Sequence, residues 1–192
     1  ENAALVLINI PPDGIELTIK SIAKDVAQGS IVCVIGGSNV LNLDLAARHL
    51  PADVGFVSSS LVLHPDRVQA GEAPAAAHVK DAMWSVAGRG SEAQMTAFAA
   101  FVESLGARTV FVDPQERDGM ALSVDTLPQL LSSMLMLTVS GDAAWKERGW
   151  AAGAGFANAT AGAEEAARRT AELLANKAAA VHWLNQLMRQ CM

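Results

Sequence analysis

Two short apolar runs, each followed directly by a pair of chain-breaking residues, constrain the fold of this chain more than any other feature. Residues 4–10 (ALVLINI) end at Pro11-Pro12, and residues 31–35 (IVCVI) end at Gly36-Gly37. Runs of this length that are almost wholly apolar are typical of strands buried on both faces of a sheet. A helical pattern at residues 15–28 separates them. Strands that alternate with helices predict a parallel, doubly wound sheet.

The alternation continues to residue 112 and then gives way to helix. Further strands are expected at 54–63, 83–87 and 108–112, with helices at 41–50 and 91–105. Beyond Asp113 we expect an apolar helix at 120–137 interrupted at Pro128, then helices at 143–150 and 163–192, with 153–160 as a break between helices. The sequence therefore predicts two domains: an incomplete Rossmann-like α/β part, residues 1–112, and a helical domain, residues 113–192.

The composition indicates a folded, globular chain. Of the 192 residues, 51% are hydrophobic and 18% charged, which excludes a disordered tail. The net charge of −6 disfavours nucleic acid and anionic membrane surfaces as partners. Polar residues interrupt each apolar run, so we expect no membrane span. The two cysteines, Cys33 and Cys191, form no disulfide framework, which fits a cytoplasmic protein.

The apolar stretch at residues 120–137 predicts self-association. A helix that is apolar on most sides needs covering on most sides. A helical domain of this size has only a marginal core of its own. We therefore expect a homodimer in which the helical domains of two chains pack on each other.

Two polar positions follow predicted strands at the edge where doubly wound sheets bind ligands. The loop Gly36-Gly37-Ser38-Asn39 follows the second strand, and its glycines permit close approach of a ligand to the backbone. His64 follows the third strand, and its imidazole could take a proton from a substrate hydroxyl near neutral pH. Neither feature requires a function: the loop could be an ordinary tight turn, and His64 an ordinary surface histidine.

Two kinds of binding motif do not occur in the sequence. There is neither a GxGxxG nor a GxxxxGK[ST] element, so the usual phosphate cradle of a nucleotide site is missing from these 192 residues. The four histidines show neither HxxxH nor HExxH spacing, so we predict no metal site.

Five segments, taken in order, resemble the prephenate and arogenate dehydrogenases of tyrosine biosynthesis. They are the Pro-Pro element at 11–12, the Gly-Ser of the loop at 37–38, the His-Pro at 64–65, residues 105–135 and the glycine-rich segment 152–163. Residues 105–135 resemble the family's passage from His-Asp to Ser-His-Leu-Pro-His. The resemblance begins partway through the family's Rossmann domain. It implies oxidative decarboxylation of a small cyclohexadienyl substrate with NAD or NADP as the cofactor.

The resemblance also implies roles for single residues. It places His64 on the ring hydroxyl of the substrate, with Ser38 orienting it, and it places Pro11, Pro12 and Gly37 against the cofactor. The substrate-binding positions fall on Arg117, Thr126, Gln129 and Thr160. Arg117, Thr126 and Gln129 stand where the family has histidines. Ala161 replaces the arginine that holds a substrate carboxylate.

Two alternatives remain open. The replaced histidines and arginine favour a non-catalytic dimerising or ligand-binding relative that kept the fold. An NAD-dependent 3-hydroxyacid or imine-reducing enzyme would also join a Rossmann domain to a helical one. Such an enzyme would use a helix lysine as its acid, but Lys146 and Lys177 lack the flanking pattern of that class.

Overall fold

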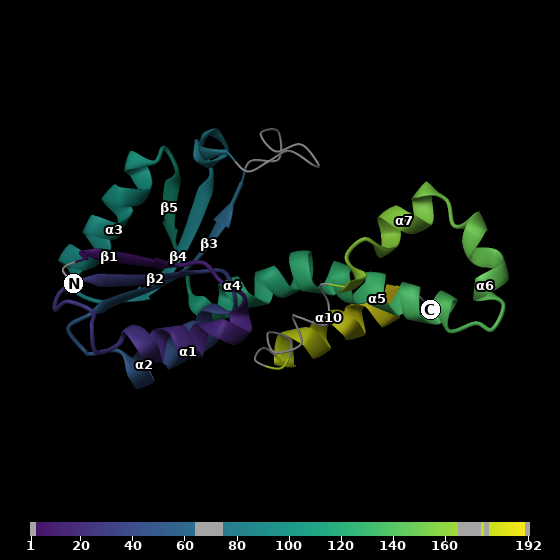
Figure 1. Cartoon of the computed structure of the whole chain (residues 1–192), viewed down its shortest axis with the longest axis horizontal. Helices are drawn as coiled ribbons and strands as arrows, with labels where there is room; N and C mark the ends of the chain where they lie inside the picture. Colours follow the sequence, from purple (N-terminus) through teal and green to yellow (C-terminus); the bar gives the residue numbers. More distant parts are fainter. Residues whose placement is uncertain (1–2, 64–74, 165–173, 175–176, 191–192) are drawn as a thin grey trace. The chain divides into compact units, whose positions relative to one another are not determined.

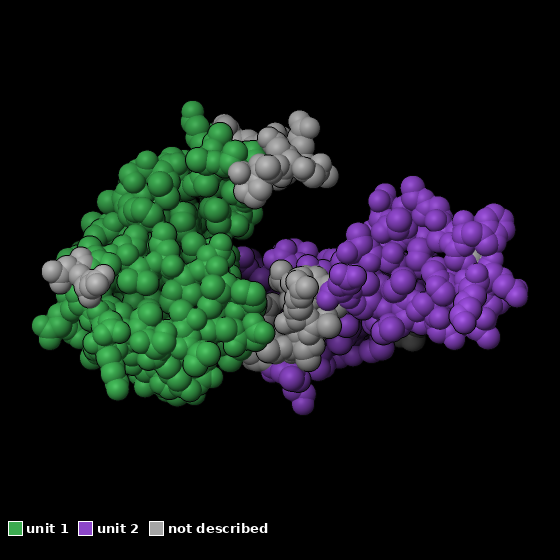
Figure 2. All heavy atoms as spheres, viewed as in Figure 1, with its two compact units in different colours: residues 1–115 green, residues 116–192 purple. Residues whose placement is uncertain are grey.

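The computed structural model describes residues 3–63, 75–164, 174 and 177–190. The chain divides into two compact units, unit 1 (Glu1–Gln115) and unit 2 (Glu116–Met192), shown in two colours in Figure 2. The division falls close to Asp113, where the sequence changes from alternating strands and helices to helix alone. Each unit is described by itself below.

Unit 1 contains a five-stranded sheet in the order β1-β2-β3-β4-β5 (Figure 1). Its strands are β1 (Leu5–Ile8), β2 (Ile31–Ile35), β3 (Gly55–Val62), β4 (Met83–Arg89) and β5 (Arg108–Phe111). The predicted α/β fold and its order of strands and helices are confirmed.

The sheet is mixed, so the prediction of an all-parallel sheet is wrong at β4. The strands β1, β2 and β3 are parallel, β4 runs antiparallel to β3, and β5 is parallel to β4. Val62, the last residue of β3, pairs with Met83, the first residue of β4. Because the two strands meet at the same edge of the sheet, their connection needs no crossover helix. The alternation of strands and helices in the sequence does not reveal this change of direction.

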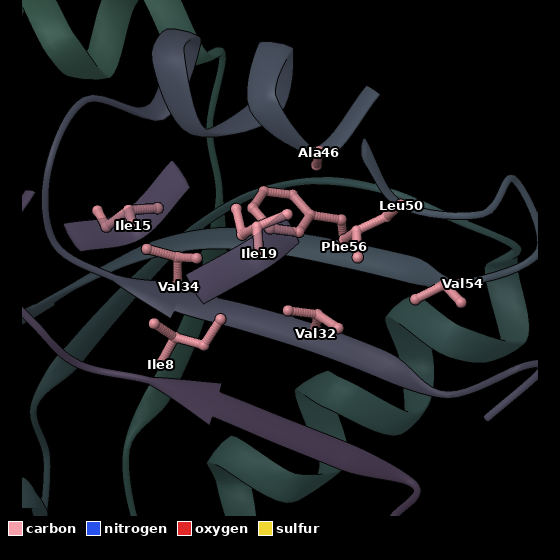
Figure 3. Close-up of a cluster of buried hydrophobic side chains, with 9 residues drawn as sticks. All are labelled: Ile8, Ile15, Ile19, Val32, Val34, Ala46, Leu50, Val54 and Phe56. Carbon is pink, nitrogen blue, oxygen red and sulfur yellow. The ribbon is translucent and has the colours of Figure 1, made fainter. Parts of the chain in front are cut away.

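Helices cover both faces of the sheet. The helices α1 (Pro12–Ile22) and α2 (Asn39–His49) lie on one face, and α3 (Glu92–Ser104) lies on the other (Figure 1). Alternate residues of β2 serve the two faces: Val32 and Val34 join the core under α1 and α2, whereas Ile31 and Cys33 join the core under α3. Figure 3 shows the first core, in which Phe56 is fully buried. A short 3-10 turn, η2 (Ala76–Val79), precedes β4.

Unit 2 is helical, as predicted. Its elements are α4 (Pro114–Ala121), which begins two residues before the unit does, η3 (Leu122–Thr126), α5 (Leu127–Ser140), α6 (Trp145–Arg148), η4 (Gly149–Ala151), α7 (Ala154–Thr160) and α10 (Lys177–Gln190). The predicted helix at 163–192 falls partly on residues outside the described ranges.

We expected Pro128 to interrupt the apolar helix predicted at 120–137, but the helix widens there and continues. Residues 114–140 form one continuous helix of 27 residues. The turn before the proline, η3, is π-helical, and the Leu127 N–H donates to the Leu122 carbonyl, five residues back. Proline has no N–H and its ring clashes with the carbonyl four residues back in a regular α-helix. A π-helical turn at this point widens the helix instead of breaking it.

One expectation about this helix is wrong. By length and composition alone it could cross a membrane, with a mean hydropathy of 1.3 over its most apolar 18 residues, although we expected no such stretch. The polar side chains that interrupt the run lower its mean hydropathy too little to exclude it. Only 11% of that window is buried in the single chain.

The segment 153–160 is helical, so the predicted break is wrong. Gly153 is the N-cap of α7 and Gly155 lies within its first turn. Glycine lowers helix propensity, which is why the sequence favoured a break. The helix is held by tertiary contacts: the ring of Phe156 lies 5.4 Å from that of Trp145, and α7 packs against α5. Packing of this kind overrides local propensity.

Candidate functional site

The carboxyl ends of β1 and β2 place the start of α1 and the start of α2 at one edge of the sheet. Pro11 is the N-cap of α1, Pro12 is its first residue, and both are exposed. The Pro11 carbonyl accepts a hydrogen bond from the Gly14 N–H at 3.0 Å. Proline suits the first helical position because its missing N–H would have had no partner there. This local role accounts for the Pro-Pro pair, and a contact with cofactor remains a prediction.

The loop after β2 has a backbone that only glycine adopts readily. Gly36 and Gly37 both have positive φ, of +94° and +71°. The Gly36 N–H donates to the Ser59 carbonyl of β3 at 2.7 Å. A Cβ built on Gly36 would meet no atom within 4 Å, whereas one on Gly37 would lie 3.5 Å from Ile15 Cδ1. The backbone is therefore approachable at Gly36, as the sequence suggested.

Ser38 caps the helix that follows this loop. Its Oγ accepts a hydrogen bond from the Leu41 N–H at 3.2 Å, and the residue is 8% exposed. A serine in this position satisfies one of the free N–H groups at a helix start. Capping explains the choice of serine without a substrate, so its role in orienting a substrate stays a prediction.

A buried polar network beneath the loop was missed by the sequence analysis. Asn42 Nδ2 donates to the Gly36 carbonyl at 2.9 Å and to Ser58 Oγ at 3.0 Å. Ser58 Oγ in turn donates to Asn39 Oδ1 at 2.7 Å. Asn39 and Asn42 are 2% exposed and Ser58 is fully buried. The signal in the sequence is a run of three serines, 58–60, in the middle of an otherwise apolar strand.

Cys33 lies on the other face of β2, within hydrogen-bond distance of a second serine. Its Sγ lies 3.4 Å from Ser59 Oγ, which also donates to the Val34 carbonyl at 3.3 Å. Burial raises the pKa of the Cys33 thiol to about 11, and the hydrogen bond with Ser59 offsets only part of this. A buried, protonated thiol is not a nucleophile. Cys33 is therefore a core residue.

Unit 2 places one predicted substrate-binding residue, Gln129, beside the chain that follows another, Thr160. Gln129 of α5 lies against the chain just after α7, because a Cβ on Gly162 would be 3.1 Å from Gln129 Cγ. Thr160, two residues earlier, is the last residue of α7, and its Oγ1 donates to the Phe156 carbonyl at 2.8 Å. Thr126 is buried at the end of η3, and Arg117 is a half-buried residue of α4.

The segments that carry Thr126, Gln129 and Thr160 offer few charges to a ligand. Residues 122–140 include one charged side chain, Asp125, and residues 153–162 include none. Gln129 Oε1 is buried and has no hydrogen-bond partner in the described part of the chain. A carboxylate placed against these helices would thus find no cation on them, although burying an unpaired carboxylate is costly.

Three further observations bear on the site. A cavity of about 450 Å³ in unit 2 is lined by Thr138, Val139, Asp142, Trp145, Ala151, Ala152, Gly153 and Phe156, none of which was predicted as a site residue. No group of three or more His, Cys, Asp or Glu that could hold a metal ion occurs in the described ranges. His64, the predicted general base, lies outside them.

Comparison with known proteins gives structural matches only. No family model and no curated protein matches the sequence. The arogenate dehydrogenase of Synechocystis has a TM-score of 0.72 at 15% identity, covering 98% of this chain and 69% of that one. The prephenate dehydrogenase of A. aeolicus, in complex with hydroxyphenyl propionate and NAD+, has a TM-score of 0.75 at 15% identity, covering 99% and 67%. A second structure of the Aquifex aeolicus enzyme has a TM-score of 0.60 at 15% identity, covering 100% and 77%.

The chain has the fold of the prephenate and arogenate dehydrogenases. The resemblance seen in the sequence is therefore confirmed at the level of the fold, over nearly the whole chain. The α/β part and the helices after it belong to that fold together. The long apolar helix 114–140 also lies within the matched length. The chain spans about two-thirds of the first two of these structures.

Proposed function

We propose that the chain is the greater part of an NAD(P)-dependent dehydrogenase that decarboxylates prephenate or arogenate oxidatively in tyrosine biosynthesis, in the cytoplasm. The observation that carries the proposal is the match of the fold, at a TM-score of 0.75 over 99% of the chain, to an enzyme solved with NAD+ and hydroxyphenyl propionate. A glycine loop and a Pro-Pro turn at the carboxyl edge of the sheet support it, because doubly wound sheets bind their ligands at that edge.

The residues at this edge fit one side of a dinucleotide. Gly36 is open at its Cα, Pro11 and Pro12 are exposed, and the Gly37 N–H makes no hydrogen bond among the described residues. We infer that Pro11, Pro12 and Gly37 line the nicotinamide side of the site. The glycine motif that usually cradles the diphosphate is not among these 192 residues. When bound, the nicotinamide supplies the hydride acceptor of the reaction.

The chemical roles fall on two residues that follow the strands. His64 would take the proton of the ring hydroxyl as the carbon that bears it loses a hydride. Departure of the ring carboxylate as carbon dioxide then leaves an aromatic ring. Ser38, at the start of α2, would orient the hydroxyl. Histidine suits the task because its ordinary pKa lies near neutral pH.

The residues at the predicted substrate-binding positions differ from those that would hold the carboxylates of prephenate. Thr126, Gln129 and Thr160 are neutral, and Ala161 offers no guanidinium. The candidates for holding a carboxylate in its place are Arg117 and, further along the chain, Arg168 and Arg169. These neutral positions support, as a second candidate, a ligand-binding relative without turnover.

Replacing Ala161 with Arg should strengthen binding of prephenate if its pocket is kept.

The experiment is a calorimetric titration of the chain with NAD+, NADP+, prephenate and arogenate. The dehydrogenase proposal expects saturable binding of one cofactor and one substrate, and turnover that is lost in His64→Asn while binding is retained. Binding without turnover in the unmodified chain would favour the second candidate. If none of the four compounds binds, the proposed activity is wrong for this chain.

We also propose that two copies associate through unit 2. Large apolar side chains are exposed along its helices, among them Val124, Leu137 and Trp150, at 69%, 71% and 87% exposure. Burying these side chains between two copies would remove apolar surface from water and stabilise a dimer. Sedimentation at micromolar concentration should show a dimer that Leu137→Asp dissociates. Leu17→Asp is the matched control, because Leu17 is 74% exposed on α1 of unit 1. A monomeric unmodified chain, or equal effects of the two variants, would contradict this assignment.

A further inference from the structure

We propose that Asn42 is a positioning residue, which turns the peptide between Gly36 and Gly37 so that the Gly37 N–H faces the ligand. The inference rests on the proposed function in one respect, that the carboxyl edge of β2 is the binding site. It assigns a role to the buried network of Asn39, Asn42 and Ser58, which that function does not otherwise use.

The Gly36 residue is held from two directions. Its N–H donates to the Ser59 carbonyl at 2.7 Å, and its carbonyl accepts from Asn42 Nδ2 at 2.9 Å. The described residues include no cis peptide bond, so the Gly36–Gly37 peptide is trans. In a trans peptide the carbonyl and the following N–H point in opposite directions. Because the Gly36 carbonyl is turned toward the buried Asn42, the Gly37 N–H is turned away from it.

The network fixes which way the Asn42 amide faces. Both protons of Nδ2 are used, one on the Gly36 carbonyl and one on Ser58 Oγ. The Ser58 hydroxyl gives its own proton to Asn39 Oδ1, so its oxygen is left to accept from Asn42. All three side chains are at most 2% exposed. A buried network whose donors are matched in this way holds a single arrangement.

The conformation that the network holds is one the backbone does not favour by itself. Two consecutive residues with φ of +94° and +71° are accessible because both are glycine, and an isolated glycine pair would sample many other shapes. The side chain of Asn42 also packs on the loop, since a Cβ on Gly37 would lie 3.6 Å from its Nδ2. Asn42 therefore selects one orientation of the loop from many.

An N–H turned away from the buried Asn42, at the start of α2, suits an acceptor oxygen. The N-terminal end of a helix favours negative charge, which adds to the attraction of the single donor. The ligand group is thus an anionic or carbonyl oxygen. A nicotinamide nucleotide and a carboxylate substrate both carry such oxygens, so the test uses NAD+ and prephenate as separate probes.

The experiment compares three variants of the full chain by NMR and by titration. Asn42→Asp keeps the shape of the side chain and removes both donated hydrogen bonds, and Ser58→Ala is a milder change that removes the relay to Asn39. Ser59→Ala is the matched control, because it deletes an equally buried hydroxyl from the next residue of β3. That hydroxyl interacts with Cys33 on the opposite face of the sheet and takes no part in the Asn42 network. In the ligand-free protein, Asn42→Asp and Ser58→Ala should shift the Gly37 amide signal and speed hydrogen exchange at Gly36 about tenfold.

The titration distinguishes a selective loss of ligand binding from a general loss of stability. At matched stability, Asn42→Asp and Ser58→Ala should weaken binding of NAD+ or prephenate about tenfold, and Ser59→Ala should leave it within about twofold. Equal effects of Ser58→Ala and Ser59→Ala on the Gly37 signal and on binding would overturn the role of Asn42. If the unmodified chain binds neither probe, the proposed function fails. The Gly36 and Gly37 measurements then decide on the positioning role alone, and it is refuted if Asn42→Asp matches Ser59→Ala.

Discussion

Unit 1 should lose stability at alkaline pH through one thiol. Burial raises the pKa of Cys33 from an ordinary value of 9.0 to about 11, so the folded state binds this proton more tightly than the unfolded state does. The stability from the protonated thiol is complete below pH 9 and is lost as the pH rises through about 11. With about 1.4 kcal/mol per pKa unit, the free energy of unfolding falls by about 1.4 kcal/mol at pH 10 and by about 2.7 kcal/mol once the folded thiol is ionised.

The assay is urea denaturation followed by circular dichroism at pH 8 and pH 10. Cys191, which lies outside the described residues, is replaced by Ser throughout, and the chain contains no tyrosine that would titrate in this range. Cys33→Ala is the reference, because it carries the same lysines and the same fold without the thiol. The stability advantage of the chain with Cys33 over this reference should shrink by about 1.4 kcal/mol between the two pH values. An advantage that stays constant would refute the argument, since it would mean that Cys33 titrates alike in the folded and unfolded chain.

Three other substitutions test the fold, each by urea denaturation at pH 7. Arg89 Nη2 donates to the carbonyls of Ala46 and Leu50 at the end of α2, so Arg89→Met should cost roughly 1.5–3 kcal/mol, and an unchanged midpoint would contradict that role. Phe98 is buried with its ring 6.2 Å from those of Trp84 and Phe101, so Phe98→Ala should cost roughly 3–5 kcal/mol; a loss below about 1 kcal/mol would show that this core is loose. Gly36→Ala should cost roughly 1–2 kcal/mol from its positive φ alone, whereas Gly153→Ala, with equal space and a φ of −80°, should be nearly neutral.

Elements with strong local signals were predicted closely. The strand at 31–35 has the predicted bounds because five consecutive apolar residues, followed by two glycines, admit few other structures. The helix predicted at 91–105 is observed as Glu92–Ser104, with Ser91 and Gln94 forming the reciprocal hydrogen bonds of a capping box. In both cases the deciding interactions lie within a few residues of each other.

Elements whose form depends on distant residues were not predicted. The direction of β4 depends on its pairing with β3, and the helical state of α7 depends on packing against α5 and Trp145. The π-helical turn before Pro128 is a third case, because the sequence shows that proline disturbs a helix but not how the helix accommodates it.

The candidate site divides in the same way. The sequence alone determined that a Gly-Gly-Ser loop and a Pro-Pro turn follow buried strands, since apolar runs and chain-breaking residues are local features. The tertiary structure decided that Ser38 caps a helix, that Cys33 is an inert core thiol, and that Asn42 and Ser58 meet beneath the loop. Asn42 and Ser58 are 16 residues apart in the chain and belong to a helix and a strand, so only the packing of α2 on the sheet brings their polar atoms together. A polar residue in an apolar stretch indicates that a hydrogen-bond partner exists, and the fold determines which residue that partner is.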